Sequence, residues 1–461
     1  MRLFLAITSH KKPIVDRFFD WPLRCLGRSV TAGLLCLSIP LMAAELTTEV
    51  TLLQAVNKSL LSHPDLAAFQ YRLKSADAYA QQAAVGEKPE IHLTLEDAFG
   101  SGQYTGFDNA QSTLSISWAL QGGLLEQRVN SAQSKLSVME LERDIKRYDV
   151  AAQTAHAFLS VLAYQERLAV VKKAQKYAFQ ILKEIQQRVE AGKSPPADKL
   201  QAEVNLERRV LEIEDIQHEL KSAKKVLASQ WGDSTVDFSR VSGAITLPEQ
   251  LINYGELKNA INNNPEIRYF LTQQRVVDSE ITLAKEETKN RWRFNAGIRR
   301  FEATEDYGVT FGVSLPIGKS SRNRHQISAL AAEQARYQAD ARAKEIQLST
   351  QLYVLYQQLE HSYHLNEALT QRILPRLEQA LAETQKAYSL GRYSYREWYA
   401  MQNEVLDTSM ELINVRVKAH NNLTEIERLT GLSITQPTAT KSATDKATFN
   451  SAALESNEDN Q

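Results

Sequence analysis

Two carboxylates stand at matched positions after two glycine turns in the sequence. In "VEAGKSPPADKLQAE" the turn at Gly192 precedes Asp198, and in "YSLGRYSYREWYAMQNE" the turn at Gly391 precedes Glu397, 199 residues further along in each case. An acid just after a turn favours a helix start, where it interacts well with the helix dipole. Carboxylates gathered around an opening instead select and retain cations. The residues alone leave both interpretations open.

Other groups that could do chemistry are sparse. The segment "HSYH" places His361 and His364 on one helix face, but no Cys or carboxylate reinforces them, so we expect a solvated face or interhelical hydrogen bonds. We find no nucleophile–base pair and no cluster of general acids, so we expect no enzyme, no cofactor and no metal site. The formal net charge of −1 argues against a broad basic surface for nucleic acid.

The glycine turns interrupt very long helical patterns. From Leu124 to Val189 there is neither Pro nor Gly, and at ~1.5 Å per residue this stretch is on the order of 100 Å long. After the first turn, apolar residues recur every seven positions, which is typical of a coiled-coil seam: Leu206, Ile213, Leu220 and Leu227. The second half has the same layout, and we expect Pro375 to kink its first long helix.

The chain therefore contains one pattern twice. "SHPDL" (62–66) matches "NNPEI" (263–267), and each is followed by a helix, two strands, a very long helix, a glycine turn and a second long helix. The strands alternate apolar and polar residues, as in a half-buried sheet or in a barrel with lipid outside and water inside. The apolar positions are Ile91, Leu93, Leu95, Leu114, Ile116, Trp118, Leu120, Trp292, Phe294, Ala296, Ile298, Val309, Phe311, Val313 and Leu315. The aromatic residues near strand ends fit an interfacial girdle or ordinary sheet packing.

The ends of the 461-residue chain have a different character. Residues 1–44 are predicted to be an export signal, because Arg24 and Arg28 precede the apolar run 30–44; an anchoring helix is the alternative. Both cysteines, Cys25 and Cys36, lie in this segment. We assign residues 45–245 to a first repeat with a connector, 246–432 to a second repeat, and 433–461 to a disordered polar tail.

Four strands cannot close a membrane barrel, since the smallest has eight. If these strands sit in a membrane, several chains must pool them: two chains give eight strands and three give twelve. The alternative, a soluble sheet packed on helices, would leave ~100 Å helices reaching into water without an evident purpose.

Several of these segments together resemble the TolC-type outer-membrane efflux family, and more closely its heavy-metal cation branch. The resemblance covers roughly residues 45–432. It depends on the duplicated layout, on "HPDL" and "NPEI", on "VSLPIGKSSRNRHQISAL" (313–330) and on "RVEAGKSPPADKLQAEVNLERR" (188–209). Cys36 fits a lipid-attachment motif poorly, so no acylation is expected.

The resemblance implies a mainly α fold with a small membrane β-barrel. As a homotrimer, the duplicated units would form a twelve-stranded β-barrel on an α-helical periplasmic tunnel. The implied function is an outer-membrane exit duct of a tripartite efflux system, with a periplasmic adaptor and an inner-membrane pump, of the RND type, as partners. Drug efflux, type I protein secretion, and a periplasmic coiled-coil scaffold without a pore are the alternatives.

The resemblance also implies roles for the two corners, which would lie at the end of the tunnel far from the barrel. Glu397 occupies the position of a gate acid, and Asp198 that of an acid that partners a tyrosine, here Tyr388, across the corner. Gly192, Gly391 and Arg392 complete this predicted periplasmic tip. Two family positions differ, because Ala400 replaces a second gate acid and Tyr393 replaces an arginine.

Overall fold

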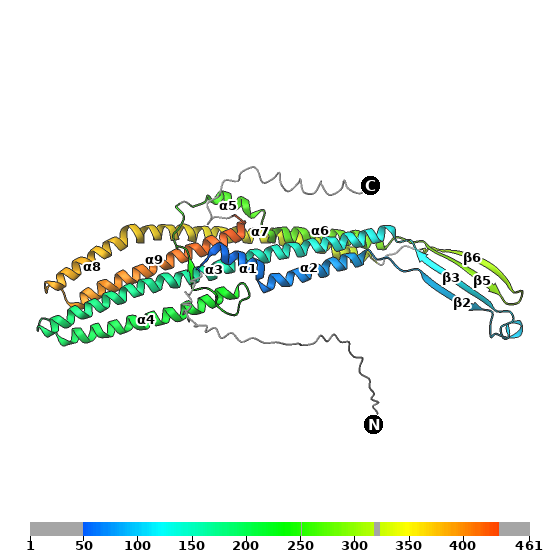
Figure 1. Cartoon of the computed structure of the whole chain (residues 1–461). Helices are drawn as coiled ribbons and strands as arrows, with labels where there is room; N and C mark the ends of the chain where they lie inside the picture. Colours follow the sequence, from blue (N-terminus) through cyan, green and yellow to red (C-terminus); the bar gives the residue numbers. More distant parts are fainter. Residues whose placement is uncertain (1–48, 250, 318–322, 433–461) are drawn as a thin grey trace, which may run out of the picture. The chain divides into compact units, whose positions relative to one another are not determined.

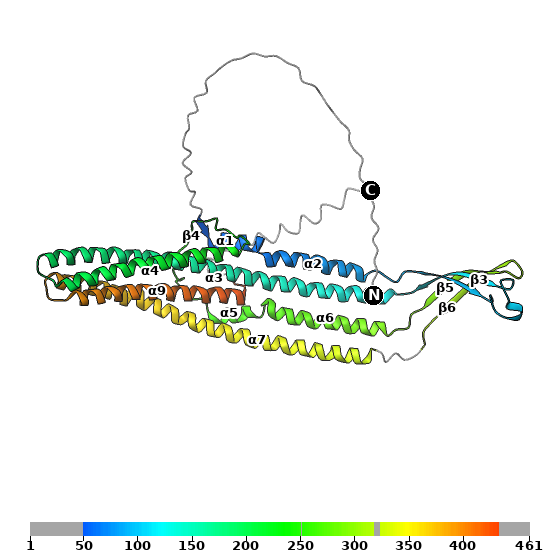
Figure 2. The same ribbon diagram turned by 90° about the horizontal axis from the view of Figure 1, so that it is seen from below.

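A computed structural model of the chain describes residues 49–249, 251–317 and 323–432, all within one compact unit, Thr47–Gln461. The expected export signal, the expected tail and part of the segment 313–330 lie outside the described residues. Figures 1 and 2 show that, in this unit, a β-sheet lies at one end of the long helices and the two helix turns at the other.

The first repeat follows the predicted order. A single helix, α3, runs through 69 residues without interruption, and α4 returns along it. On α4, Leu227 is buried, and Leu206, Ile213 and Leu220 are partly buried, as the seven-residue spacing predicts. The elements are α1 (Leu52–Ser62), α2 (Pro64–Ala83), β2 (Glu90–Glu96), a short 3₁₀ helix (Gly102–Tyr104), β3 (Gln111–Ala119), α3 (Gly122–Glu190) and α4 (Pro196–Ser229).

The second repeat has the same order, with one irregularity. Its first long helix changes to a π-helical segment directly before Pro375, which lies in the first turn of α8. Proline lacks the backbone N–H of a helix interior, and the α-helical pattern is interrupted just before it; the predicted kink itself stays a prediction. The elements are α5 (Tyr254–Ile261), α6 (Pro265–Glu287), β5 (Arg293–Phe301), β6 (Asp306–Ser314), α7 (Arg324–Glu367), η2 (Ala368–Ile373), α8 (Leu374–Ser389) and α9 (Tyr395–Thr430).

A parallel pair of short strands was not predicted. β1 (Glu49–Thr51) pairs with β4 (Arg240–Ser242), and Val50 lies opposite Val241. The connector between the repeats is thereby fixed to the beginning of the described chain. Three-residue strands lack a repeating pattern, so sequence periodicity could not reveal them.

The two hairpins form one four-stranded antiparallel sheet in the order β2-β3-β5-β6. The β3–β5 pairing joins the repeats and sets Leu114 opposite Ile298 and Ile116 opposite Ala296. This register brings the predicted apolar residues of all four strands onto one face, in the rows Leu93–Leu114–Ile298–Val309, Ile91–Ile116–Ala296–Phe311 and Trp118–Phe294–Val313.

No other part of the described chain covers this apolar face. Leu93 is 77% exposed and Phe311 is 83% exposed, and Leu95 and Trp118 are exposed as well. A contiguous apolar surface of this kind marks a face that contacts a membrane or another protein.

Three strand assignments need correction by one residue each, since Leu120 and Leu315 lie just after β3 and β6, and Trp292 lies just before β5. Trp292 precedes β5 by one residue and is outside the strand, although its carbonyl oxygen accepts a hydrogen bond from Leu120 N at 3.0 Å. One hydrogen bond thus extends the β3–β5 pairing beyond the end of the strand. A single bond does not make the repeated pairing of a strand, so Trp292 is not a strand residue.

The opposite face of the sheet is polar. Arg299 lies on this face, where its guanidinium pairs with Glu96 at 3.0 Å and donates to Thr113 Oγ1 at 2.9 Å. Gly297 and Gly312 also belong to this face, and a Cβ on Gly297 would lie 2.6 Å from Ser115 Cβ. Strands approach this closely where glycine permits it, as at a tight bend of a barrel wall.

Each repeat has its own helical core. In the first repeat Phe158, Val161 and Leu227 are buried together with Trp231. In the second, Leu352, Leu359, Leu423 and Ile426 are buried against α5. No helix in the described part of the chain is long and apolar enough to cross a membrane.

Candidate functional site

The two helix corners have the same backbone geometry. Gly192 (φ 71°) and Gly391 (φ 73°) are both left-handed, a conformation that side chains with a Cβ rarely adopt. In the first corner Lys193 N donates to Arg188 O at 2.7 Å and Gly192 N to Val189 O at 3.0 Å. In the second, Arg392 N donates to Ala387 O and Gly391 N to Tyr388 O, each at 2.9 Å. Both are Schellman turns, so the duplication predicted from sequence extends to individual hydrogen bonds.

The matched acids also occupy the same helical position. Asp198 is the third residue of α4, and Glu397 is the third residue of α9. Glu397 forms a capping box: its carboxylate accepts from Ser394 N at 2.7 Å, and Glu397 N donates to Ser394 Oγ at 3.4 Å. The Ser394 backbone N–H lowers the pKa of this exposed carboxyl, which is therefore ionised at neutral pH. The helix-start interpretation is correct for Glu397, and its charge still faces water.

An aromatic core, which sequence reasoning missed, lies beneath the corners. Tyr388, Tyr395 and Trp398 are buried together with Ile181, Ile185 and Ala202. The rings of Tyr388 and Trp398 lie 4.9 Å apart, and Asn205 donates to the hydroxyl of Tyr395 at 2.7 Å. The recurrence of Tyr and Trp in "YSYREWY" is the sequence signal that could have indicated it. This core holds the α3–α4 and α8–α9 turns together within one chain.

No hydrogen bond joins Tyr388 to Asp198 in the described part of the chain. Burial raises the pKa of Tyr388, the Asp198 carboxylate adds to that rise, and Ser194 and Arg188 oppose it. The Tyr388 hydroxyl is buried and has no well-formed partner among the described residues. The expected Tyr388–Asp198 bond is thus not made within this chain, because the tyrosine ring lies in the aromatic core.

The remaining predicted tip residues are exposed. Arg392 follows Gly391 on the surface of the turn, and Tyr393 is 47% exposed beside it. Ala400 lies on the exposed side of α9, away from the buried Trp398. These side chains remain available to groups outside the chain.

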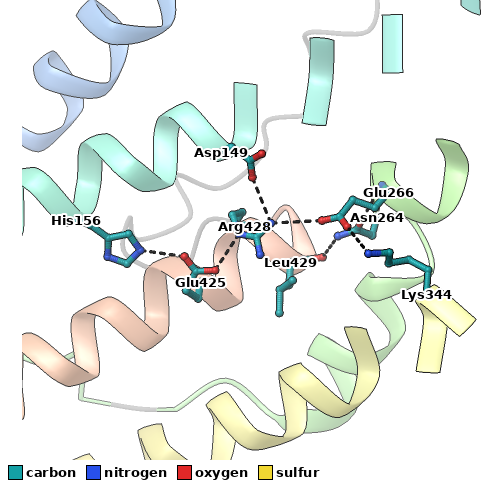
Figure 3. A network of polar contacts seen from close by, with 8 residues as sticks. All are labelled: Asp149, His156, Asn264, Glu266, Lys344, Glu425, Arg428 and Leu429. Carbon is teal, nitrogen blue, oxygen red and sulfur yellow. Dashed lines mark hydrogen bonds and ion pairs between the residues drawn. The ribbon is translucent and has the colours of Figure 1, made fainter. Parts of the chain in front are cut away.

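A second polar cluster lies where the two repeats meet (Figure 3). At its centre, Arg428 of α9 contacts three acids from three helices: Glu425 at 2.8 Å, Asp149 of α3 at 3.3 Å and Glu266 of α6 at 3.4 Å. Lys344 of α7 adds a contact to Glu266 at 3.2 Å. Asn264 donates to the carbonyl oxygen of Leu429 at 2.8 Å, which fixes the end of α9. The cluster is a joint between helices, with each acid facing a cation.

The same cluster shifts the pKa values of its members. The hydrogen bond from His156 lowers the pKa of Glu425 to about 2, and the bond to Glu425 raises the pKa of His156. Burial raises the pKa of Asp149, and the nearby Arg428 opposes that rise. These shifts belong to an ion-pair network that joins helices of the two repeats.

Within the described residues, no group of three or more His, Cys, Asp or Glu is arranged to hold a metal ion. His361 and His364 are exposed on α7, as the solvated-face interpretation predicts.

Comparison with known proteins agrees with this architecture. The family model described as outer membrane efflux protein matches residues 55–233 and 257–432, the two repeats. The cobalt-zinc-cadmium resistance protein CzcC of Cupriavidus metallidurans is 24% identical over 396 residues, covering 85% of this chain and 93% of the relative. The nickel-cobalt-cadmium resistance protein NccC of Alcaligenes xylosoxydans is 23% identical over 317 residues, covering 68% and 70%. Among solved structures, CusC shares the fold, with a TM-score of 0.66 at 16% identity, covering 83% of this chain and 92% of CusC.

Proposed function

The chain belongs to the outer membrane efflux protein family, and from that premise we propose that three copies form one continuous exit duct. Family membership makes the protein an efflux component of the outer membrane with a helical periplasmic part. The proposal adds the homotrimer, a twelve-stranded barrel and a tunnel that conducts cargo passively. It adds that the protein supplies passage and no energy, and that it is not an enzyme.

The observation that carries the proposal is the uncovered apolar face of the sheet. Its residues are in register across four strands, while the opposite face carries the Arg299–Glu96 pair and two glycines. Lipid on one side and water on the other satisfies both faces. A four-stranded sheet cannot satisfy them alone, whereas three copies provide enough strands to close a barrel.

We further propose that the corners form the periplasmic gate. Asp198, Glu397 and Arg392 put charge at the exposed ends of the hairpins, and the Gly192 and Gly391 turns give both ends one shape. In a trimer six such corners surround one opening, so the acids form a ring that favours cations. The hydroxyl of Tyr388 is buried without a well-formed partner within the described chain, so an acid of an adjacent corner would satisfy it only where assembly uncovers that hydroxyl.

For cargo we propose heavy-metal cations, on the basis of the resistance proteins that the chain resembles. A water-filled tunnel needs no coordinating site for its cargo. A periplasmic adaptor and an RND-type inner-membrane pump would deliver the cations. Drug efflux and type I protein secretion use the same kind of duct and remain the alternatives within this fold.

The decisive experiment first measures the mass and the heat-modifiability of the purified assembly. The full-length protein is then reconstituted in planar bilayers. We expect a heat-modifiable trimer that conducts ions. A soluble assembly without conductance would establish the pore-free scaffold instead. Deleting the gene should then sensitise cells to Zn²⁺, Co²⁺ or Cd²⁺, and a sensitivity confined to drugs would refute the metal assignment.

A further inference from the structure

Arg188 connects the two corners. It lies in the last turn of α3, and its carbonyl oxygen accepts the Lys193 amide at 2.7 Å, which closes the first Schellman turn. Its side chain leaves that corner, and Nη1 donates to the carbonyl oxygen of Ser389 at 3.1 Å. One residue therefore takes part in closing both helix ends.

The acceptor is a carbonyl for which α8 has no donor. Ser389 is the last residue of α8, and the amides of Gly391 and Arg392 are used by the carbonyls of Tyr388 and Ala387. A cation at this end also interacts favourably with the negative end of the helix dipole. The guanidinium of Arg188 thus acts as the C-terminal cap of a helix in the other repeat.

The ring of Tyr388 provides the second contact. Arg188 Cζ lies 4.8 Å from the ring centroid, within the range of a cation–π interaction. Trp398 of α9 contacts the same ring, so residues from α3, α8 and α9 meet at Tyr388. Arg188 makes no ion pair in the part of the chain that the structure describes, and its buried Nε is unpartnered.

We propose that Arg188 is the positioning residue of the gate, a role that rests on the corner gate proposed above. Its guanidinium sets the rest position of the α8–α9 corner against α3. Any widening of the opening that moves this corner away from α3 breaks both contacts of Arg188. Sequence spacing could not reveal the role, because Arg188 and Ser389 are 201 residues apart.

The test compares Arg188→Met with Lys193→Met in the assembled full-length protein. Both variants remove one positive charge from the first corner, but the Lys193 side chain is exposed and its backbone amide is retained. Hydrogen exchange is measured at the amides of Gly391 and Arg392, and single-channel conductance is measured in planar bilayers. Arg188→Lys keeps the charge but lacks the planar fork.

We expect about tenfold faster exchange and a higher conductance for Arg188→Met, since a charge-assisted bond is lost. Arg188→Lys should lie between this variant and wild type, and Lys193→Met should match wild type. If Arg188→Met does not assemble, the same comparison is made with Arg188→Lys, where wild-type values in both measurements overturn the proposal.

The outcomes separate the two proposals. A wild-type protein that never conducts refutes the duct, whatever the exchange shows. A conducting wild type with unchanged exchange and conductance in Arg188→Met refutes the role of Arg188 alone. Faster exchange with unchanged conductance shows a purely structural cap and overturns the gate role.

Discussion

His156 Nε2 of α3 lies 2.9 Å from Glu425 Oε1 of α9, and this contact joins the two repeats across 269 residues of sequence (Figure 3). The other ring nitrogen of His156 lies 2.8 Å from Asn421 Oδ1. The imidazolium form of His156 can donate from both ring nitrogens, and the bond to Glu425 raises the pKa of His156 above its ordinary value. The contact is a charged bond where His156 is protonated, so its strength depends on pH.

This pair predicts a pH-dependent stability between the repeats. Because the pKa of His156 is raised above its ordinary value of 6.5, its contribution is complete below pH 6.5 and is lost as pH rises through the raised value. The pKa of the Glu425 carboxyl is lowered from 4.5 to about 2, so its contribution to stability is complete above pH 4.5 and is lost as pH falls toward 2. We expect His156→Gln to lower the Tm most between pH 4.5 and 6.5, and progressively less at higher pH. His218→Gln, a change at an exposed histidine, is the control; a Tm difference that stays constant from pH 5 to 9 would contradict the prediction.

Arg428 is predicted to be the most sensitive cation of the joint. Replacing it with Met leaves Asp149, Glu266 and Glu425 without their shared partner, and we expect a loss of about 1.5–3 kcal/mol in the free energy of unfolding. Urea denaturation of the detergent-solubilised protein measures this loss. The matched control Arg336→Met removes an exposed intrahelical pair and should change stability by less than ~1 kcal/mol. Equal effects of the two variants would show that the joint contributes no more than a surface pair.

Neighbouring positions on β6 test the membrane face. Phe311 belongs to the exposed apolar face and Thr310 to the opposite face. We expect Phe311→Arg to cost about 2–4 kcal/mol and to reduce assembled protein in the outer membrane, while Thr310→Arg should cost less than Phe311→Arg because its charge stays in the water-filled lumen. Leu93→Arg and Phe294→Arg should behave like Phe311→Arg.

Cysteine labelling checks the same assignment in intact membranes. A water-soluble maleimide should modify cysteines placed at positions 92 and 293 through the lumen, and should leave those at 93 and 294 unmodified. Equal modification of both sets would rule out a lipid-facing sheet.

Glu397 can be tested without disturbing the helix start. Glutamine also completes a capping box, so Glu397→Gln keeps the cap and removes the charge. We expect the cation preference of the reconstituted channel to fall by about twofold, because one screened charge per chain changes local cation energies by tenths of a kcal/mol. Ser394→Ala, which removes the cap and keeps the charge, should reduce stability and leave ion preference unchanged. Unchanged ion preference in Glu397→Gln would place the selective step elsewhere.

Tyr388 and Asp198 yield a separate prediction about assembly. If the free Tyr388 hydroxyl bonds to an acid in the closed trimer, Tyr388→Phe with Asp198→Ala should raise single-channel conductance without reducing trimer yield. A charge-assisted bond of this kind contributes roughly 1.5–3 kcal/mol. If the conductance of this variant equals that of wild type, the corner is a structural turn and not a gate.

The sequence alone determined the elements and their duplication, because both depend on local periodicity. Alternation of period two fixed the strands and their apolar face, the absence of Pro and Gly fixed the length of α3, and Gly192 and Gly391 fixed the corners. Only the tertiary structure decided which side chains meet between elements. The β3–β5 register, the crossing of Arg188 to Ser389 and the His156–Glu425 bond each join residues more than 170 positions apart. No local pattern encodes such pairs, since they depend on how two helices or strands are packed in space.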